Sequence, residues 1–275
     1  RSLSSSALVN ETGVEQLAER YPLRIILRGL QDAGEVLMLL GDVLRELPRG
    51  IRKIPLVVQQ MVAIGIGSMP LTLIVALFTG AVAAVQASYQ FRDYVPMIYL
   101  GTVIGKSVVI ELGPVLTALV VGGRVGASIA AELGTMRVTE QVDAMETMGI
   151  SPTRYLVVPR FVAATLMLPV LTIFADVIAI FGGFLVSVFT LDVSAHTFSS
   201  GLKLYFHLRD VFSGLIKAFF FGMIISTMGC YYGLRSEGGA EGVGVATTHA
   251  VVASCLLILI VDYLLASFLF RVLFA

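Results

Sequence analysis

The chain has 275 residues, of which 57% are hydrophobic and 14% are charged, and its mean hydropathy is +0.90. A soluble domain carries about a quarter charged residues, so this composition predicts an integral membrane protein. The formal net charge is zero, which gives no electrostatic basis for binding nucleic acid.

Cysteines and histidines are few and scattered. Two cysteines cannot make a disulfide framework, and neither they nor the histidines have the spacing of a zinc site. We therefore predict no metal site. The residues in question are Cys230, Cys255, His196, His207 and His249.

The N-terminal part divides into two segments before the first long apolar stretch. Residues 1–22 carry no motif that predicts a function. Residues 23–53 contain "LRIILRGLQDAGEVLMLLGDVLRE" (23–46), in which apolar residues recur at helical spacing among charged ones. This pattern is typical of an amphipathic helix in the membrane interface. A soluble amphipathic helix packed on a partner would give the same pattern and is the alternative.

Five later stretches are long and apolar enough to span a bilayer. They are residues 68–89, 108–132, 161–189, 211–234 and 249–271. The first is apolar from Ile54 onward, but Gly65, Gly67 and Pro70 predict a break there. The predicted fold is therefore an all-α integral membrane protein with an interfacial helix and one domain of five transmembrane helices, residues 54–275.

The Lys and Arg residues predict the orientation. They are more frequent on the side that holds the N-terminus, which places that end in the cytoplasm and the C-terminus outside. In this assignment Lys106 and Lys217 lie on the non-cytoplasmic side.

The stretch "GTVIGKSVVI" (101–110) resembles a phosphate-binding loop only superficially. Such a loop has four residues between its glycines and joins a strand to a helix, whereas Gly101 and Gly105 enclose three residues before an apolar span. Lys106 is better explained as a charge that reaches the membrane surface from a helix start.

The second span carries charges inside an apolar segment. A charge at mid-bilayer costs at least ~2.5 kcal/mol, so Glu111 and Arg124 need polar surroundings. Thirteen residues, or about 20 Å of helix, separate them, so each needs another partner or a place near a membrane surface. The small residues of this span form a seam that serves either packing within one subunit or a homodimer contact. They are Gly122, Gly126, Ala130 and Gly134.

A short helix is predicted in the loop after the second span. Thr139 can cap it, and Gly149 can end it. Glu140 and Asp143 then lie near its first turn, where the helix dipole favours anions. The helix also carries methionines, which suit an adaptable contact surface. It is either a solvated loop helix or a docking helix for a soluble partner.

Acidic residues in the later spans allow two interpretations. Placing the carboxylates of Asp176 and Asp262 in lipid costs free energy, so each is either a hydrogen-bonded structural acid or part of a proton or ion pathway. We favour the structural interpretation because neither acid has an evident His or Lys relay in the sequence.

No nucleophile with a neighbouring base, HExxH motif or other catalytic set is present, so we predict no catalytic residue and no enzyme activity for this chain. Intramembrane acids also occur in secondary carriers and channels, so transport by a carrier or channel that needs no ATPase is one function that the sequence allows.

Two stretches carry a resemblance to a known family. They are "ELGPVLTALVVGGRVGASIAAELGTMRVTEQVDAMETMGISPTRYLVVPR" (111–160) and "GGAEGVGVATTHAVV" (238–252). They resemble the MlaE (YrbE) permease family, the membrane subunits of ABC lipid transporters in bacterial inner membranes and plastid envelopes. The likeness extends from about Leu23 to the C-terminus.

The resemblance implies a homodimer with two cytoplasmic ABC ATPase subunits. ATP and Mg would bind to these partners and no cofactor to this chain. An MCE-domain lipid-binding protein would stand on the far side, and phospholipid would lie between the protomers. The implied location is the bacterial inner membrane, with the plastid inner envelope as the alternative.

The resemblance also implies site residues. Most of the implied lipid-binding residues share one helical face of the first span, although packing in the protein core would produce the same pattern. Glu111 and Asp262, from the second and fifth spans, belong to the same implied site. The implied lipid-binding residues are Phe78, Val82, Val85, Gln86, Tyr89, Glu111 and Asp262. The implied ATPase-coupling residues are Thr139, Glu140, Gln141, Asp143, Met145, Glu146 and Met148. Many relatives have Arg where this chain has Ile110, and that arginine is a candidate contact to the lipid phosphate. Lys106, one helical turn earlier, is a candidate to replace it in this chain.

Overall fold

The structure is a computed structural model, and it describes residues 31–91 and 94–273; within this part every regular element is helical. The prediction of an all-α membrane protein is confirmed, because five helical segments are long and apolar enough to span a membrane. They are Ile54–Phe91, Tyr99–Val138, Thr153–Phe189, Leu208–Leu234 and Gly239–Arg271.

The second span is a chain of helical pieces. It consists of α3 (Tyr99–Ser107), η1 (Val108–Leu112), α4 (Gly113–Val121), η2 (Gly122–Gly126) and α5 (Ala127–Val138). Both η pieces are π-helical. The other spans are α2 (Ile54–Phe91), η3 (Thr153–Val157) with α7 (Val158–Phe189), α9 (Leu208–Leu234) and α10 (Gly239–Leu273). Two short helices connect them, α6 (Gln141–Thr147) and α8 (Ala195–Leu204).

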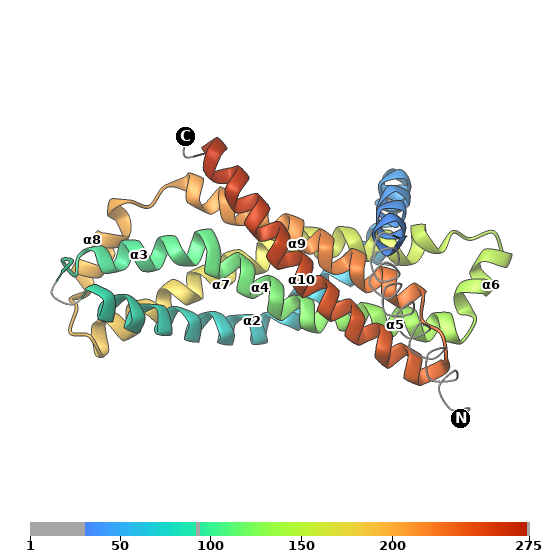
Figure 1. The fold of residues 1–275 in the computed structure, drawn as a ribbon, viewed down its shortest axis with the longest axis horizontal. Coiled ribbons are helices and arrows are strands. Elements are labelled where there is room, and N and C mark those ends of the chain that lie inside the picture. Colours follow the sequence, from blue (N-terminus) through green and yellow to red (C-terminus); the bar gives the residue numbers. More distant parts are fainter. Residues whose placement is uncertain (1–30, 92–93, 274–275) are drawn as a thin grey trace, which may run out of the picture.

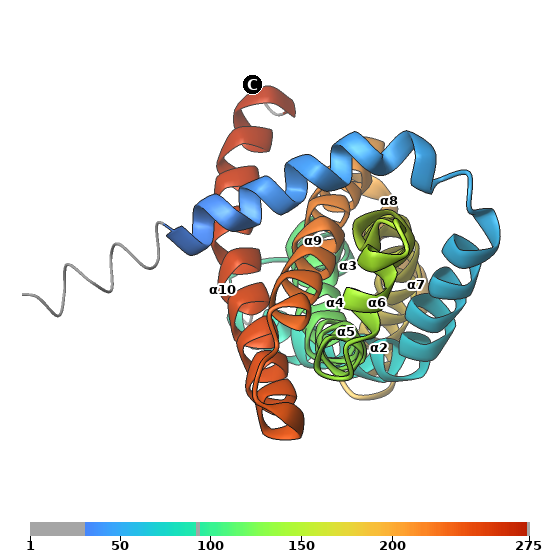
Figure 2. The same cartoon turned by 90° about the vertical axis from the view of Figure 1, so that its right-hand side faces the viewer.

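The spans form an elongated bundle (Figure 1), in which α10 crosses obliquely over its neighbours. Figure 2 looks along the bundle from the end that carries α6, and it shows the helix over residues 31–50 lying across the spans. Val43 is only 1% exposed and belongs to the core, whereas Leu37 and Met38 are exposed. This helix therefore packs on the bundle and also presents apolar side chains outward, as an interfacial helix does. The predicted residues 23–30 lie outside the described residues.

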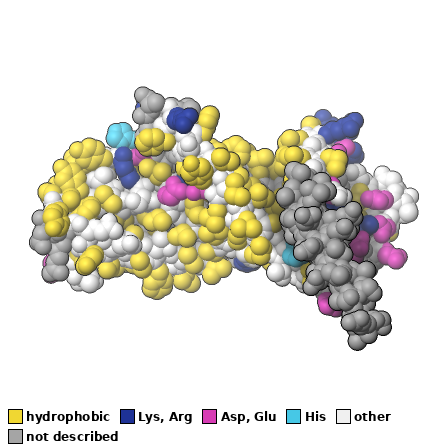
Figure 3. Space-filling view, in the orientation of Figure 1, with side chains coloured by type: hydrophobic (Ala, Val, Ile, Leu, Met, Phe, Trp, Pro, Cys, Tyr) yellow, Lys and Arg dark blue, Asp and Glu magenta, His cyan; other side chains and the backbone are white. Residues whose placement is uncertain are grey.

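The surface matches this arrangement. Hydrophobic side chains cover much of the spanning helices in Figure 3, and acidic side chains gather toward the end that carries α6. An apolar surface of this extent suits lipid rather than water.

The predicted break in the first span is wrong. α2 continues from Ile54 through Pro70, although proline removes one backbone hydrogen bond. Gly65 and Gly67 do not interrupt the helix; they leave room for the Met167 side chain and the Arg124 guanidinium, respectively. Tertiary packing thus outweighs the local helix-breaking signals.

The stretch 101–110 is helical, in α3 and η1, and not a loop. Gly101 and Gly105 lie against α8, at Phe198 and Leu202. The glycines therefore allow close helix packing, and the structure supports the rejection of a phosphate-binding loop.

Candidate functional site

A cluster of charged side chains lies where the second, fourth and fifth spans meet. Lys217 of α9 is 1% exposed, and its Nζ lies 2.6 Å from Glu111 Oε2 and 2.9 Å from Asp262 Oδ1. The Glu111 side chain is 45% exposed, so the cluster opens to one side of the bundle. A buried ammonium between two carboxylates avoids the cost of an unpaired charge in a membrane.

Two sequence predictions change at this cluster. Lys217 is not a surface charge on the non-cytoplasmic side but a buried partner of the intramembrane acids. Asp262 does have a lysine beside it, because Lys217 is brought there by α9. This pairing could not be predicted from local patterns, since the three residues are far apart along the chain.

The π-helical turn η1 holds Glu111 in position. The amide of Gly113 donates to the carbonyl of Val108, which is the longer π-type bond, and Pro114 follows with no N–H to offer. Gly214 of α9 lies directly against the carbonyl of Val109, where a larger residue would not fit. Since Lys217 is one helical turn after Gly214, this close approach lets its side chain reach Glu111.

Asp176 of α7 packs next to the π-helical turn η1, against Gly113. It is 8% exposed, and its carboxylate packs against the backbone of Gly113. Its Oδ1 has no hydrogen-bond partner among the described residues. In the described part of the chain, the ion pairs of Lys217 are with Glu111 and Asp262 and do not include Asp176.

The predicted lipid-binding face of the first span points away from the core. Phe78 is 65% exposed and Tyr89 is 80% exposed, so core packing within this chain does not explain the face. Val82, Val85, Gln86 and Tyr89 line a shallow groove with Ala81 and with Val186 of α7. Glu111 and Asp262 do not line this groove, so the predicted lipid-binding residues fall into two places.

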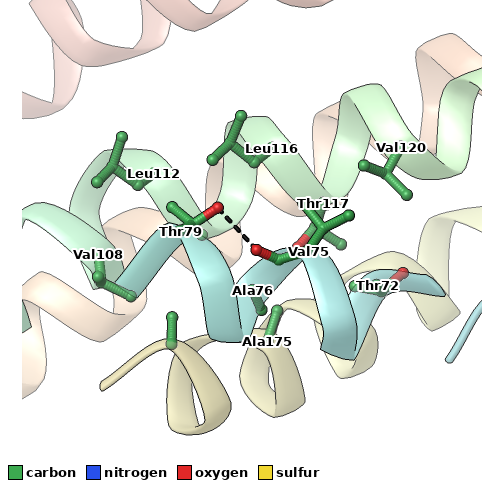
Figure 4. Close-up of a pocket in the computed structure, with 12 residues that line it drawn as sticks. Thr72, Val75, Ala76, Thr79, Val108, Leu112, Leu116, Thr117, Val120 and Ala175 are labelled. Atoms are coloured by element: carbon green, nitrogen blue, oxygen red, sulfur yellow. Dashed lines mark hydrogen bonds between the residues drawn. The ribbon is translucent and has the colours of Figure 1, made fainter. Parts of the chain in front are cut away.

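A second, small apolar depression lies between α2, the η1–α4 segment and α7. Figure 4 shows Leu112, Leu116 and Val120 of the second span above Val75 and Thr79 of α2, with the Thr79 hydroxyl bonded to the Val75 carbonyl (2.8 Å). These residues were not predicted as site residues. Their helical spacing marks a shared face, but that pattern is also the pattern of an ordinary core.

Lys106 and Arg124 have separate partners. Lys106 Nζ lies 3.4 Å from Asp210 Oδ2, and this aspartate side chain is fully buried, so Lys106 is tied to α9 rather than free at the surface. Arg124 donates a hydrogen bond of 2.8 Å to Ser68 Oγ in the first span. As predicted, Glu111 and Arg124 do not pair with each other.

The predicted loop helix exists, but its start differs. α6 begins after Glu140, which has a left-handed backbone (φ 59°), and the Thr139 hydroxyl donates to the Thr135 carbonyl of the preceding helix. The Thr139 cap was therefore wrong, because Thr139 still ends α5. Gly149, with φ 71°, follows the helix as predicted.

The side chains of α6 differ in their exposure and in whether their charges are paired within the chain. Asp143 forms an ion pair with Arg137 of α5, so its charge is used within the chain. Glu140, Gln141, Glu146 and Met148 are exposed, and Met145 is half-buried. These exposed residues can contact a partner.

The helix over residues 31–50 is fastened at both ends. Near one end, Nη1 of Arg235, the residue that follows α9, lies 2.5 Å from Glu35 Oε2. Near the other, Arg154 Nε donates to Glu46 Oε2 at 2.8 Å, and this bond lowers the pKa of Glu46 below its usual range. Since Arg154 lies in η3, shortly after α6, the interfacial helix is linked to the connection that follows the loop helix.

The small-residue seam of the second span faces α9 and α10 of the same chain. Gly122 lies near Ile225 and Ile258, and Gly134 near Ser236 and Val243. Gly126 lies between Ile225 and Ser254, and Ala130 is fully buried. These contacts are those of packing within one subunit.

Among the described residues, no group of three or more His, Cys, Asp or Glu side chains could hold a metal ion.

The comparisons with known proteins agree with this architecture. Residues 57–268 match the family described as Permease MlaE. The chain is 46% identical to a probable ABC transporter permease protein of Rickettsia typhi, over 79% of this chain and 84% of that protein. It is 35% identical to the intermembrane phospholipid transport system permease protein MlaE of Haemophilus influenzae, over 88% and 92% of the two chains. It is 34% identical to protein TRIGALACTOSYLDIACYLGLYCEROL 1, chloroplastic, of Arabidopsis thaliana, over 98% and 78%. The resemblance noted in the sequence is thus confirmed: this multi-pass membrane protein belongs to the MlaE permease family.

Proposed function

We propose that the chain is the permease subunit of an ATP-driven phospholipid transporter, and that it works as a homodimer in a bacterial inner membrane with its N-terminus in the cytoplasm. The Haemophilus relative is named as a permease of a phospholipid transport system, and the Rickettsia relative as an ABC transporter permease. The observation that carries the proposal is the half-open Lys217–Glu111–Asp262 cluster, which lies among apolar membrane-spanning helices.

A phospholipid has a charged headgroup and apolar chains, so its site needs both kinds of surface. The Lys217 cluster offers one ammonium and two carboxylates, of which Glu111 is accessible. The groove at Val82, Val85 and Tyr89 offers apolar side chains at the surface of α2. In the proposed dimer these surfaces of two protomers would enclose one lipid, with the headgroup at the cluster.

Energy would enter through α6. In this proposal ATP and Mg would bind to a separate cytoplasmic ATPase, which would contact the exposed Glu146 and Met148. Closure of the ATPase would move α6, and the η3 turn that follows would pass the movement to α7. An MCE-domain protein on the other side would receive or deliver the lipid.

The test is reconstitution of the full chain with its ATPase in phospholipid vesicles. We expect lipid transfer that requires ATP hydrolysis, and we expect a photo-reactive residue at position 89 to capture phospholipid. The matched control is the same residue at Phe189, which is also exposed, at the end of α7. Transfer that persists without ATP but stops when a proton gradient is collapsed would favour the alternative of a secondary carrier. Equal capture at both positions would remove the groove from the proposal.

A further inference from the structure

Arg124 is an unusual charge in this bundle. It is exposed, and its guanidinium donates to Ser68 Oγ, while no carboxylate lies within 4.0 Å of it among the residues that the structure describes. The other well-buried or interfacial cations of the spans have acidic partners, such as Lys106 with Asp210 and Arg160 with Glu132.

The depth of Arg124 can be read from its neighbours. Glu132 pairs with Arg160, and Val158, two residues earlier, packs against Gly50 at the end of the interfacial helix. Glu132 therefore lies near the level of the cytoplasmic membrane surface. Arg124 is eight residues further into the span, or about 12 Å at 1.5 Å per residue.

The side chain does not escape to that surface. Arginine normally extends toward the interface when its backbone is buried in lipid. Here the guanidinium bonds to Ser68, which is fourteen residues, or about 20 Å, into α2 from Ile54. Ser68 is itself fully buried, so the guanidinium is held at this depth. A cation that is exposed at this depth is costly unless an anion joins it.

A groove leads to this guanidinium. It has a volume of about 380 Å³ and lies between α2 and the η2–α5 segment, with Gln60, Ala63 and Gly67 on one wall and Arg124, Ser128 and Glu132 on the other. Ligand sites commonly enclose about 300 Å³ or more, so a headgroup fits. Gly67 has no side chain, and this leaves the guanidinium in contact with the α2 backbone.

Glu132 does not cancel the positive end of the groove. It is bonded to Arg160 at 2.9 Å and also accepts a hydrogen bond from Ser128 at 3.2 Å. The groove therefore has a neutralised end at the membrane surface and a positive end in the membrane.

We propose that this groove is a second phospholipid site, in which the guanidinium of Arg124 binds the phosphate of a glycerophospholipid from the cytoplasmic leaflet. The inference rests on the proposed transport function, and it adds a site on the cytoplasmic half of the membrane, apart from the Lys217 cluster. A second copy of the chain is the competing occupant. The lipid is favoured because the acids in the described parts of the spans are paired or buried at this depth, which leaves no carboxylate for a partner copy to offer.

The test places a photo-reactive residue at Ala63, in the full chain reconstituted in phosphatidylcholine vesicles that contain phosphatidylglycerol. We expect a phospholipid adduct whose yield falls about tenfold or more in Arg124→Gln, because a charge-assisted bond to the phosphate is lost. Arg124→Lys should keep most of the yield. Lys203→Gln is the matched control, since it removes an exposed cation of α8 on another part of the chain.

Two further measurements separate binding of the phosphate from other causes of an adduct at Ala63. Diacylglycerol with the same chains lacks the phosphate, so its adduct should not depend on Arg124. Ser68→Ala frees the guanidinium without removing its charge and should lower the phospholipid yield even if Arg124→Gln does not fold. A yield that is the same for phospholipid and diacylglycerol, or that does not change in Arg124→Gln, overturns the proposal. So does a disulfide between two copies through Ser128→Cys with no lipid adduct at Ala63.

The two proposals fail separately. If capture at position 89 and ATP-dependent transfer persist while the Ala63 adduct is independent of Arg124, only the second site is wrong. If capture at position 89 and ATP-dependent transfer are both absent, the proposed function itself is wrong.

Discussion

Lys217 and Glu111 are 106 residues apart in sequence, and their side chains meet at 2.6 Å inside the bundle, where Asp262 Oδ1 lies 2.9 Å from the same ammonium. The contact joins α9 to a π-helical turn of the second span and to α10. It therefore links three spans and forms part of the polar surface that we propose for the lipid headgroup.

Removing the ammonium should cost more than removing one carboxylate. Lys217→Met leaves Glu111 and Asp262 without a counter-charge, and breaking a buried pair in this way costs about 3–5 kcal/mol. Glu111→Gln leaves Lys217 paired with Asp262, so its cost should be smaller. Thermal unfolding in detergent, followed by size-exclusion of the soluble fraction, measures the order. Lys217→Arg is the charge-preserving control, and equal stability of Lys217→Met and wild type would contradict the assignment.

The approach of α9 to the π turn depends on Gly214. Gly214→Val should destabilise the protein by about 1–3 kcal/mol or more, because the added carbons meet the backbone carbonyl of Val109 and cannot move aside. Gly123→Val is the matched control, since nothing lies within 4 Å of a side chain added there. Unfolding temperatures measure both. If the two variants lose the same stability, close packing at Gly214 is not the cause.

The attachment of the interfacial helix should depend on pH. The hydrogen bond from Arg154 lowers the pKa of Glu46, so the bonded carboxylate contributes to attachment above the unfolded pKa of about 4.3. This contribution is lost as the pH falls through the lowered value. The protection factors of the amides in residues 31–50, which compare each exchange rate with that of an unstructured amide at the same pH, should therefore fall at acidic pH. Glu46→Gln should exchange faster already at neutral pH, whereas Asp42→Asn, an exposed neighbour on the same helix, should not.

The loop helix offers two kinds of acidic residue with different expected effects. Glu146 is exposed, so Glu146→Lys should weaken copurification of the ATPase and uncouple ATP hydrolysis from transfer without loss of stability. Asp143 is paired with Arg137, so Asp143→Asn should first loosen α6 itself, which hydrogen exchange would report. A Glu146→Lys complex that assembles and couples normally would argue against α6 as the contact.

Glu140 provides a backbone control for the same helix. A left-handed residue other than glycine costs about 1–2 kcal/mol, so Glu140→Gly should keep the turn and relieve that cost. We expect unchanged or slightly raised thermal stability of the full chain. Glu140→Val should lower it, since a β-branched residue fits this backbone poorly.

The fold was largely predictable from the sequence, and the site was not. The membrane spans depend on hydropathy, which is a local property, and so does the helix that ends at Gly149. The predicted break at Pro70 was wrong because long-range packing holds α2 together. The predicted cap at Thr139 was wrong because its hydroxyl already bonds within α5.

By itself, the sequence determined that the chain enters a membrane with five spans, and its signature residues determined the family. The tertiary structure alone decided which charges meet. A charge in lipid must find a counter-charge or a polar contact, but hydropathy does not say where on another helix that partner lies. Only the packed helices bring Lys217 to Glu111 and Asp262, and only they leave Arg124 with Ser68 and an open groove.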